Sequence, residues 1–153
     1  MIKIGIDPSG TGTTAIAFFE DNKLIDKYEY TNRDWIVQTN IILDELRAEA
    51  IINIEDCLYT SANASKDRDD LLKLIGAIKY KTEKLLNINW VSPRHTKSVL
   101  KNMKNLSKYN DSCIWKFEKD ANLTYQYGKG WKYNNENISN HLRDAIIIAN
   151  YES

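Results

Sequence analysis

Hydrophobic and polar positions alternate along the first third of the chain as they do in β-strands. Three segments of this kind cover residues 2–7, 13–20 and 24–30. A turn containing Gly10 and Gly12 separates the first two, and Asp21 with Asn22 separates the second from the third. Because short turns join antiparallel neighbours, we predict a meander of three antiparallel strands.

Apolar residues then recur at helical spacing, interrupted by short continuous apolar runs. The elements predicted here are a helix over 34–49 capped by Thr31 or Asn32, a strand over 51–55, a helix over 69–86 and a strand over 89–92. A short apolar run such as 51–55 is typical of a buried parallel strand. Helices that cross over between such strands indicate an α/β protein.

For the last third of the chain the pattern predicts helices and one long loop. We expect helical segments within 96–104 and 107–121, a loop rich in Gly, Tyr and Asn over 124–137, and a final helix over 138–151 opened by Asn137 or Ser139. No repeat or Pro/Gly-rich linker interrupts the chain. The fold class predicted is therefore α/β, a single domain over 1–153 with a mixed five-stranded sheet and helices on both faces.

Composition adds little beyond this frame. The chain has 153 residues, of which 42% are hydrophobic and 27% charged, as in ordinary globular proteins. No apolar stretch approaches the roughly 20 residues that span a bilayer, and Asp7 interrupts the apolar run that a secretory signal needs. We expect a soluble cytoplasmic protein with no membrane contact.

The two cysteines, Cys57 and Cys113, are too few for a disulfide framework and form no C-x-x-C pair. We expect two reduced thiols. A cysteine nucleophile paired with His95 or His141 is the alternative, which no local motif supports.

A net charge of zero conceals a basic region. Residues 79–132 hold twelve Lys and Arg against four Asp and Glu. A solvated face is the simplest explanation for a charge run. Aromatic residues are interleaved with these cations, however, among them Trp90, Trp115 and Trp131. Cations mixed with aromatic rings suit a phosphate backbone with bases available for stacking.

Three acidic residues are placed to converge. Asp7 and Glu55 end two strands that a crossover helix would make parallel neighbours, about 5 Å apart. Two carboxylates at this distance repel each other unless a cation lies between them. His141 and Asp144, three positions apart, share one face of the last helix, and Asp144 needs a partner in its apolar surroundings.

Each of these acids also has a purely structural explanation. Asp7 can be a turn former, Glu55 half of a surface ion pair, and Asp144 the partner of Arg143 or Arg94. The joint occurrence of all three with His141 favours a functional site.

Four motifs in fixed order resemble the RuvC family of Holliday-junction resolvases, within the ribonuclease H-like superfamily. These are IGIDP over 4–8, IE at 54–55, VSPRHTK over 91–97 and HLRDA over 141–145, with LKLIG over 72–76 between them. The ordered set spans nearly the whole chain. The resemblance implies a ribonuclease H-like sheet with strand order 3-2-1-4-5. The small size and the richness in Lys, Asn and Ile suggest a bacteriophage member, acting in a bacterial or phage-infected cell.

The resemblance implies that Asp7, Glu55, Asp144 and His141 hold metal and catalyse phosphodiester hydrolysis. Two Mg²⁺ ions, which Mn²⁺ can replace, would activate water and neutralise the leaving oxygen. Asp7 would hold both ions, Glu55 one and Asp144 the other. His141 would bind a metal or move a proton.

The resemblance also implies a homodimer that nicks two strands of a four-way DNA junction symmetrically and uses no nucleotide cofactor. The basic residues expected to contact DNA are Arg94, Lys97 and Lys104. Lys101 or Lys108 would reach the scissile phosphate. Leu58 and Tyr59 occupy the place of the family's aromatic wedge and are also expected to contact DNA. The chain departs from the family at three places: the turn after Asp7, which inserts Ser9 before Gly10; the replacement of the wedge by Leu58 and Tyr59; and a long segment over 125–137 with no assigned role.

Three other functions remain open. Residues 5–14 are similar to the first phosphate loop of actin-like ATPases, which need two lobes where this chain has one. A ribonuclease H-like or YqgF-like nuclease would act on RNA or on a hybrid. A catalytically silent DNA-binding dimer would not need the acids. The glycine turn lacks a Lys at Walker spacing, so no P-loop is present.

Overall fold

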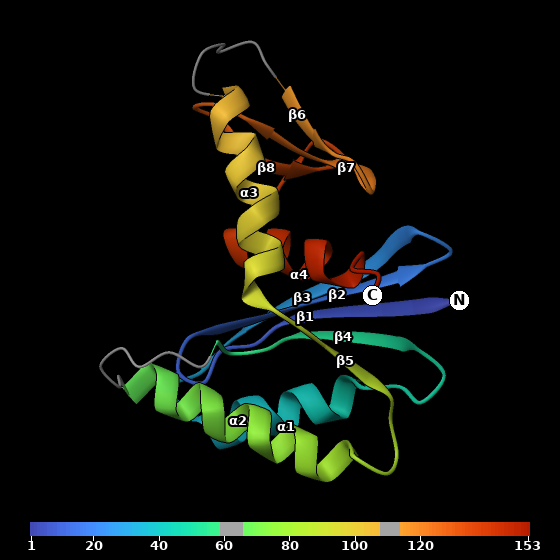
Figure 1. The fold of residues 1–153 in the computed structure, drawn as a ribbon, viewed down its shortest axis with the longest axis vertical. Coiled ribbons are helices and arrows are strands. Elements are labelled where there is room, and N and C mark those ends of the chain that lie inside the picture. Colours follow the sequence, from blue (N-terminus) through green and yellow to red (C-terminus); the bar gives the residue numbers. More distant parts are fainter. Residues whose placement is uncertain (59–65, 108–113) are drawn as a thin grey trace.

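A computed structural model describes residues 1–58, 66–107 and 114–153, and for 104–107 it describes only the backbone. Its main feature is a five-stranded mixed sheet with the order β3-β2-β1-β4-β5 (Figure 1), as predicted. The strands are β1 (Ile2–Asp7), β2 (Thr13–Glu20), β3 (Lys23–Thr31), β4 (Ile51–Glu55) and β5 (Ile88–Val91). The first three form an antiparallel meander, while β4 lies parallel to both β1 and β5.

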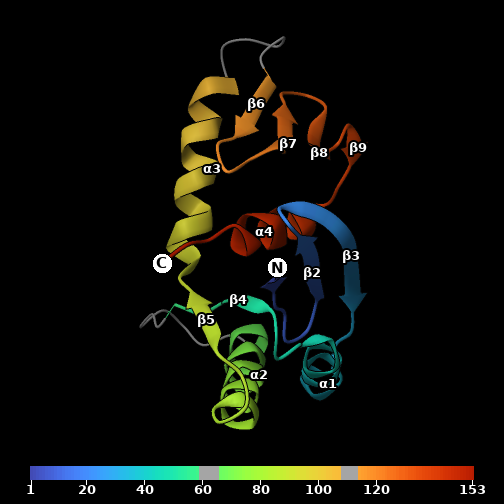
Figure 2. The same cartoon turned by 90° about the vertical axis from the view of Figure 1, so that its right-hand side faces the viewer.

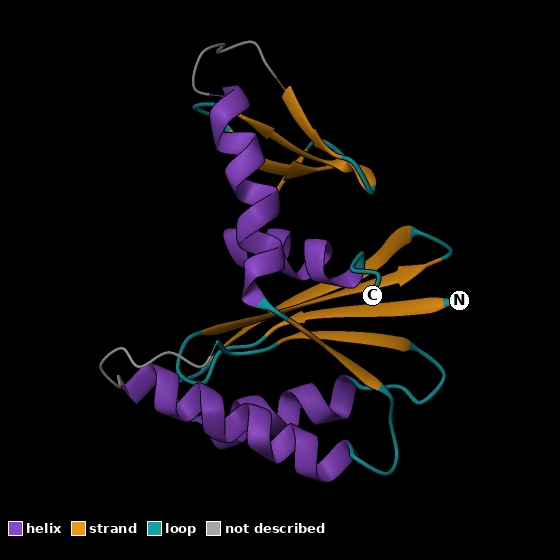
Figure 3. Ribbon diagram, viewed as in Figure 1, coloured by secondary structure: helices purple, strands orange, loops and turns teal. Residues whose placement is uncertain are grey.

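Helices cover both faces of this sheet (Figures 1 and 2). The helices are α1 (Trp35–Glu45), α2 (Lys66–Thr82), α3 (Pro93–Ser107) and α4 (Asn140–Ala149). Helices α1 and α2 pack against one face, where they bury Ile4 and Ile6 of β1. Helix α4 lies on the other face, and α3 leaves the end of β5, crosses α4 and extends away from the main sheet (Figure 3). No helix among the described residues is long and apolar enough to span a membrane.

Helix α4 approaches the sheet very closely at Gly5 of β1. A Cβ atom at Gly5 would lie 2.1 Å from the carbonyl oxygen of Ala145 and 2.5 Å from the Cβ of Ala149. Nearby Ala15 and Ala17 of β2 are also fully buried in this layer. Small residues on this face of β1 and β2 therefore set how near α4 can come.

Asn53, a polar residue in the middle of apolar β4, fixes the other end of α4. Its fully buried amide Nδ2 donates hydrogen bonds to the carbonyl oxygens of Ile148 at 2.9 Å, Ala149 at 3.3 Å and Tyr151 at 3.1 Å. Its Oδ1 accepts from Asn89 Nδ2 at 2.9 Å. The last carbonyls of a helix have no partners within the helix, so Asn53 satisfies them inside the protein.

The structure contradicts the prediction for the segment between α3 and α4. Residues 114–137 form a second, four-stranded antiparallel sheet where we expected a helix to 121 and then a loop. Its strands are β6 (Ile114–Phe117), β7 (Asp120–Gln126), β8 (Gly130–Tyr133) and β9 (Glu136–Asn137). The sheet stands beside α3 at one end of the molecule (Figure 1).

Alternating side chains explain why this segment is a sheet. Leu123, Trp131 and Tyr133 point inward and pack with Leu142 of α4 in one buried cluster. The turns that join β7 to β8 and β8 to β9 contain positive φ angles at Gly128, Gly130, Asn134 and Asn135. Gly and Asn are the residues that most readily adopt such angles in hairpins.

Helix boundaries differ from the predictions by a few residues. Asp34, and neither Thr31 nor Asn32, caps α1, because its carboxylate accepts the amide of Ile36. Ser139, one of the two predicted caps, caps α4 by accepting the amide of Leu142. Both caps satisfy amides that have no partner in the first helical turn.

Candidate metal and nucleic-acid site

Asp7 and Glu55 end neighbouring parallel strands at the same edge of the main sheet. Strands β1 and β4 pair in parallel, with Ile6 opposite Ile54, so the two acids occupy the next position on each strand. The Asp7 side chain is 15% exposed. This edge, at the carboxyl ends of parallel strands, is where α/β proteins commonly bind ligands.

The first turn of α4 brings two more polar side chains to this edge. The Nδ1 atom of His141 lies 3.5 Å from Oδ2 of Asp7. Asp144, one turn later on the same face, is close enough to raise the pKa values of both Asp7 and Glu55 through its charge. The structure therefore groups the four residues that the sequence singled out around one sheet edge.

Burial and mutual repulsion raise the pKa values of Asp7 and Glu55. Burial, and to a smaller extent the charge of Asp7, raises the pKa of Glu55 to about 7. A hydrogen bond from Thr96 opposes this rise. The Thr96 hydroxyl donates that bond to Oε2 of Glu55 at 2.8 Å. Burial also raises the pKa of Asp7, although the hydrogen bond with His141 opposes the rise. A cluster of acids that resists ionisation is a common property of functional sites.

Asp7 and burial act in opposite directions on the pKa of His141. The hydrogen bond with Asp7 raises the pKa of His141, more than partial burial lowers it. Half of the His141 side chain remains exposed, so it is accessible from solvent. A protonated imidazole at near-neutral pH can act as a general acid.

Asp144 is paired with its neighbour in the sequence. Nε of Arg143 donates to Oδ1 of Asp144 at 2.8 Å, which confirms the ion pair considered as a structural explanation for this acid. The Arg143 guanidinium also lies 4.9 Å from the centre of the Trp131 ring. Arg143 therefore connects the candidate acid to the second sheet.

The donor set fits hard divalent cations, although it is not closed around one. Three carboxylates are ligands that Mg²⁺ or Mn²⁺ accept, whereas the imidazole of His141 is more typical of other transition metals. Within residues 1–58, 66–107 and 114–153, no three His, Cys, Asp or Glu side chains lie close enough together to hold an ion as they stand. The repulsion among Asp7, Glu55 and Asp144 is the observation that favours a cation, because a positive charge would relieve it.

Positively charged side chains lie along α3, which leads away from this edge of the sheet. Arg94, Lys97 and Lys101 occupy positions that share one helix face, and all three are exposed. Lys97 is near enough to Glu55 for its charge to oppose the rise in the pKa of Glu55. Leu58 lies just beyond Glu55 and is half-buried.

Several predicted residues fall outside the described part of the chain. These are Tyr59, Lys108, Cys113 and the side chain of Lys104. Cys57 packs with the apolar cluster under α1 and α2, as expected of a structural thiol. His95 packs edge-on against Tyr151, with ring centres 4.9 Å apart.

The turn after Asp7 uses its own side chains to satisfy its backbone. The Ser9 amide donates to Oγ1 of Thr14 at 3.0 Å, and the Gly12 amide donates to Oγ of Ser9 at 2.8 Å. A Cβ at Gly10 would lie 2.6 Å from the amide nitrogen of Leu71 in α2. The glycine that resembled part of a phosphate loop therefore serves helix packing, and these two amides already have partners.

Two residues important to the geometry were not predicted. Thr96 positions Glu55, and the buried Asn53 holds α4 in place. Thr96 lies inside the VSPRHTK segment, but nothing in the sequence indicates that its hydroxyl contacts Glu55. A lone Asn in an apolar strand was the available signal for Asn53.

No protein-family model and no curated protein sequence matches this chain. Among solved structures, the chain is similar to T. thermophilus RuvC in complex with a Holliday junction substrate. The two share 12% sequence identity and superpose with a TM-score of 0.52, over 98% of this chain and 91% of that one. The chain therefore has the RuvC fold, of the ribonuclease H-like type, with a second sheet between α3 and α4.

Proposed function

We propose that this protein is a metal-dependent endonuclease that resolves four-way DNA junctions, acting as a homodimer that makes paired nicks. The observation that carries the proposal is the gathering of Asp7, Glu55, Asp144 and His141 at one sheet edge, beside the cations of α3. The solved structure with a similar fold is a RuvC bound to a Holliday junction, which supports the choice of substrate.

In this mechanism the residues of the chain have separate tasks. Asp7, central to the cluster, would hold both divalent ions, Glu55 one of them and Asp144 the other. Bound there, the ions supply an activated water and neutralise the charge on the leaving oxygen. Thr96 orients Glu55, and Arg143 orients Asp144.

His141 would supply a proton during the reaction. Its Nδ1 lies 3.5 Å from Oδ2 of Asp7, and the hydrogen bond with Asp7 raises the pKa of the imidazole, which favours the protonated ring. Proton donation to the leaving 3′ or 5′ oxygen would avoid expelling an unprotonated alkoxide. The exposed cations of α3 would hold the phosphates on either side of the cut.

A comparison of substrates tests this proposal. Purified protein is incubated with a synthetic four-way junction, a flap, a linear duplex and an RNA–DNA hybrid, with Mg²⁺ and with EDTA. We expect paired symmetric nicks in the junction, only with Mg²⁺, and none from a folded Asp7→Asn variant. Preferential cutting of the hybrid would instead indicate a ribonuclease H-like activity. Nicking by Asp7→Asn at the wild-type rate would refute the assignment of the site.

A further inference from the structure

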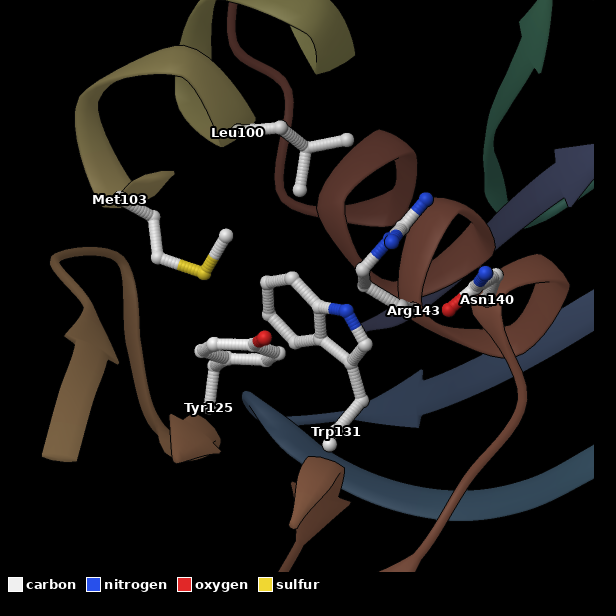
Figure 4. A pocket seen from close by; sticks show the side chains of 7 residues that line it. Leu100, Met103, Tyr125, Trp131, Asn140 and Arg143 are labelled. Carbon is white, nitrogen blue, oxygen red and sulfur yellow. The ribbon is translucent and has the colours of Figure 1, made fainter. Parts of the chain in front are cut away.

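A pocket of about 470 Å³ lies where α3, α4 and the second sheet meet. Figure 4 shows Leu100 and Met103 of α3 on one side, the rings of Tyr125 and Trp131 on another, and Asn140 and Arg143 of α4 on a third. Apolar and aromatic walls with a few polar groups at one side are typical of sites that bind small planar ligands.

The pocket borders the candidate metal site. Along the first turn of α4, His141 and Asp144 face the sheet edge, whereas Asn140 and Arg143 line the pocket. These two pairs occupy adjacent faces of one helix, whose diameter with side chains is about 10–12 Å. The pocket therefore opens within about one or two nucleotides of the residues proposed to cut the strand.

The aromatic wall has one ring that remains open to a ligand. Trp131 is 7% exposed, and it packs between Arg143, 4.9 Å from its ring centre, and Tyr125, whose ring centre is 5.1 Å away. Tyr125 itself is half-buried and lines the pocket. A planar base can stack on such a ring, and an aromatic face accepts any of the four bases.

The polar groups favour a base of a nucleic-acid strand over a purely apolar occupant. Asn140 is exposed and offers both a hydrogen-bond donor and an acceptor, as the edge of a base requires. Arg143, whose Nε is paired with Asp144, also lines the pocket, and its guanidinium has further N–H groups that can donate to the edge of a base. Resting on the proposed nuclease function, we infer that this pocket takes up one unstacked base of the DNA strand beside the cleaved phosphate.

Removing bases one at a time tests this inference. A set of four-way junctions carries a single abasic residue at successive positions around the nick, and kcat/KM is measured on each. One position should lower the kcat/KM of the wild type roughly tenfold, the scale of base–aromatic stacking. Tyr125→Ala should lose about as much on the intact junction and nothing further from that abasic site.

Matched variants separate stacking from damage to the fold. Tyr125→Phe keeps the ring and should behave as the wild type. Tyr127→Ala removes an aromatic residue of the β7–β8 turn that is 52% exposed and lies outside the pocket lining, and it should retain the wild-type abasic profile. Asn140→Ala should flatten any preference among the four bases at the sensitive position without removing the stacking effect.

The outcomes distinguish this inference from the proposed function. If the wild type nicks junctions and Tyr125→Ala shows the same abasic profile as the wild type, the pocket does not bind a base, while the nuclease proposal stands. If no substrate is cut, fluorescence anisotropy with the same abasic series in Ca²⁺ measures binding alone. A position-specific loss that depends on Tyr125 would then support the pocket without the nuclease, and its absence would overturn both.

Discussion

His141 and Asp7 lie at opposite ends of the chain, yet Nδ1 of the imidazole is 3.5 Å from Oδ2 of the carboxylate. The contact favours the charged form of each partner. It raises the pKa of His141. It lowers the pKa of Asp7, but burial of Asp7 has the larger effect, so the pKa of Asp7 is raised overall. The site therefore holds more protons at neutral pH than its residues would in an unfolded chain, which makes it responsive to cations and to pH.

Mg²⁺ should stabilise the folded protein through these acids. At alkaline pH and saturating Mg²⁺ we expect the free energy of unfolding to rise by about 2–3 kcal/mol, as for a ligand well above its dissociation constant. Asp7→Asn should abolish this gain and, without metal, be more stable than the wild type because one repelling charge is gone. Thermal unfolding with and without Mg²⁺ measures both effects, with Asp69→Asn on the exposed start of α2 as the control.

Without metal, stability should increase as the pH falls. The pKa of Glu55 is about 7 in the folded protein and 4.5 ordinarily, so the folded state binds this proton more tightly than the unfolded chain. The free energy of unfolding should therefore rise by about 2 kcal/mol between about pH 8 and pH 5 from Glu55 alone. The raised pKa values of Asp7 and His141 act in the same direction.

Urea titrations at several pH values check this dependence in wild type and in Glu55→Gln. The Gln variant retains an acceptor for Thr96 and should show a flatter profile. Glu83→Gln, a change at an exposed carboxylate, serves as the control. An identical slope in Glu55→Gln and wild type would contradict the perturbed pKa.

Cations on α3 should determine the salt dependence of DNA binding. Each phosphate contact to duplex DNA adds about 0.9 to the slope of log affinity against log salt concentration. Replacing Arg94, Lys97 and Lys101 together by Ala should lower that slope by about 3. Anisotropy titrations over a range of KCl concentrations measure it. Lys84→Ala, an exposed change beyond the end of α2, should leave the slope unchanged.

Asn53 should contribute strongly to the free energy of unfolding. Asn53→Ala would remove this partner from the carbonyl oxygens of Ala149 and Tyr151 and from the amide of Asn89, whereas the carbonyl of Ile148 still accepts the Tyr151 amide. Loss of satisfied buried polar groups costs about 1–3 kcal/mol each, so we expect a destabilisation of about 3 kcal/mol. Chemical denaturation measures it, and Asn87→Ala, at an exposed Asn, should change stability by less than about 0.5 kcal/mol.

Glycine substitutions at two positions should have opposite effects. Gly5→Ala would force α4 away from β1, because its Cβ meets backbone atoms at 2.1–2.5 Å. We expect a loss of about 3 kcal/mol and, since α4 carries His141 and Asp144, a loss of junction cleavage in the protein that remains folded. Gly76→Ala in α2 meets nothing within 4 Å and should stabilise the helix by about 0.5–1 kcal/mol. Denaturation curves with parallel cleavage assays compare the two.

The main sheet could be predicted from the sequence because its signals are local. Alternation over β1 to β3 and the apolar run at β4 give strand type directly. The parallel contact of β1 with β4, and hence the shared edge of Asp7 and Glu55, follows from the crossover through α1. The acids were thus found by their place at strand ends.

The sequence does not predict the second sheet, because the pattern within 107–121 favours a helix and the composition of 124–137 is that of a loop. Trp131 and Tyr133 alternate with polar neighbours, and Asn134-Asn135 is a good hairpin turn. The same Gly, Tyr and Asn residues are also common in irregular loops, and strands of four residues such as β6 and β8 give little periodicity. The role of Arg143 between Asp144 and Trp131 depends on this sheet, so no local signal predicted its contact with the ring.

The second sheet lies between α3 and α4 in the chain, and each of these helices is attached to the main sheet by its own contacts. Thr96 ties the start of α3 to Glu55, and Asn53 with Gly5 fastens α4 to β4 and β1. The contacts that place Glu55 and the end of α4 on the main sheet therefore come from the main sheet and α3, while the second sheet is linked to Asp144 through Arg143 and Trp131. Such a layout would let the surface proposed to contact DNA change in sequence and length while the proposed catalytic residues keep their positions.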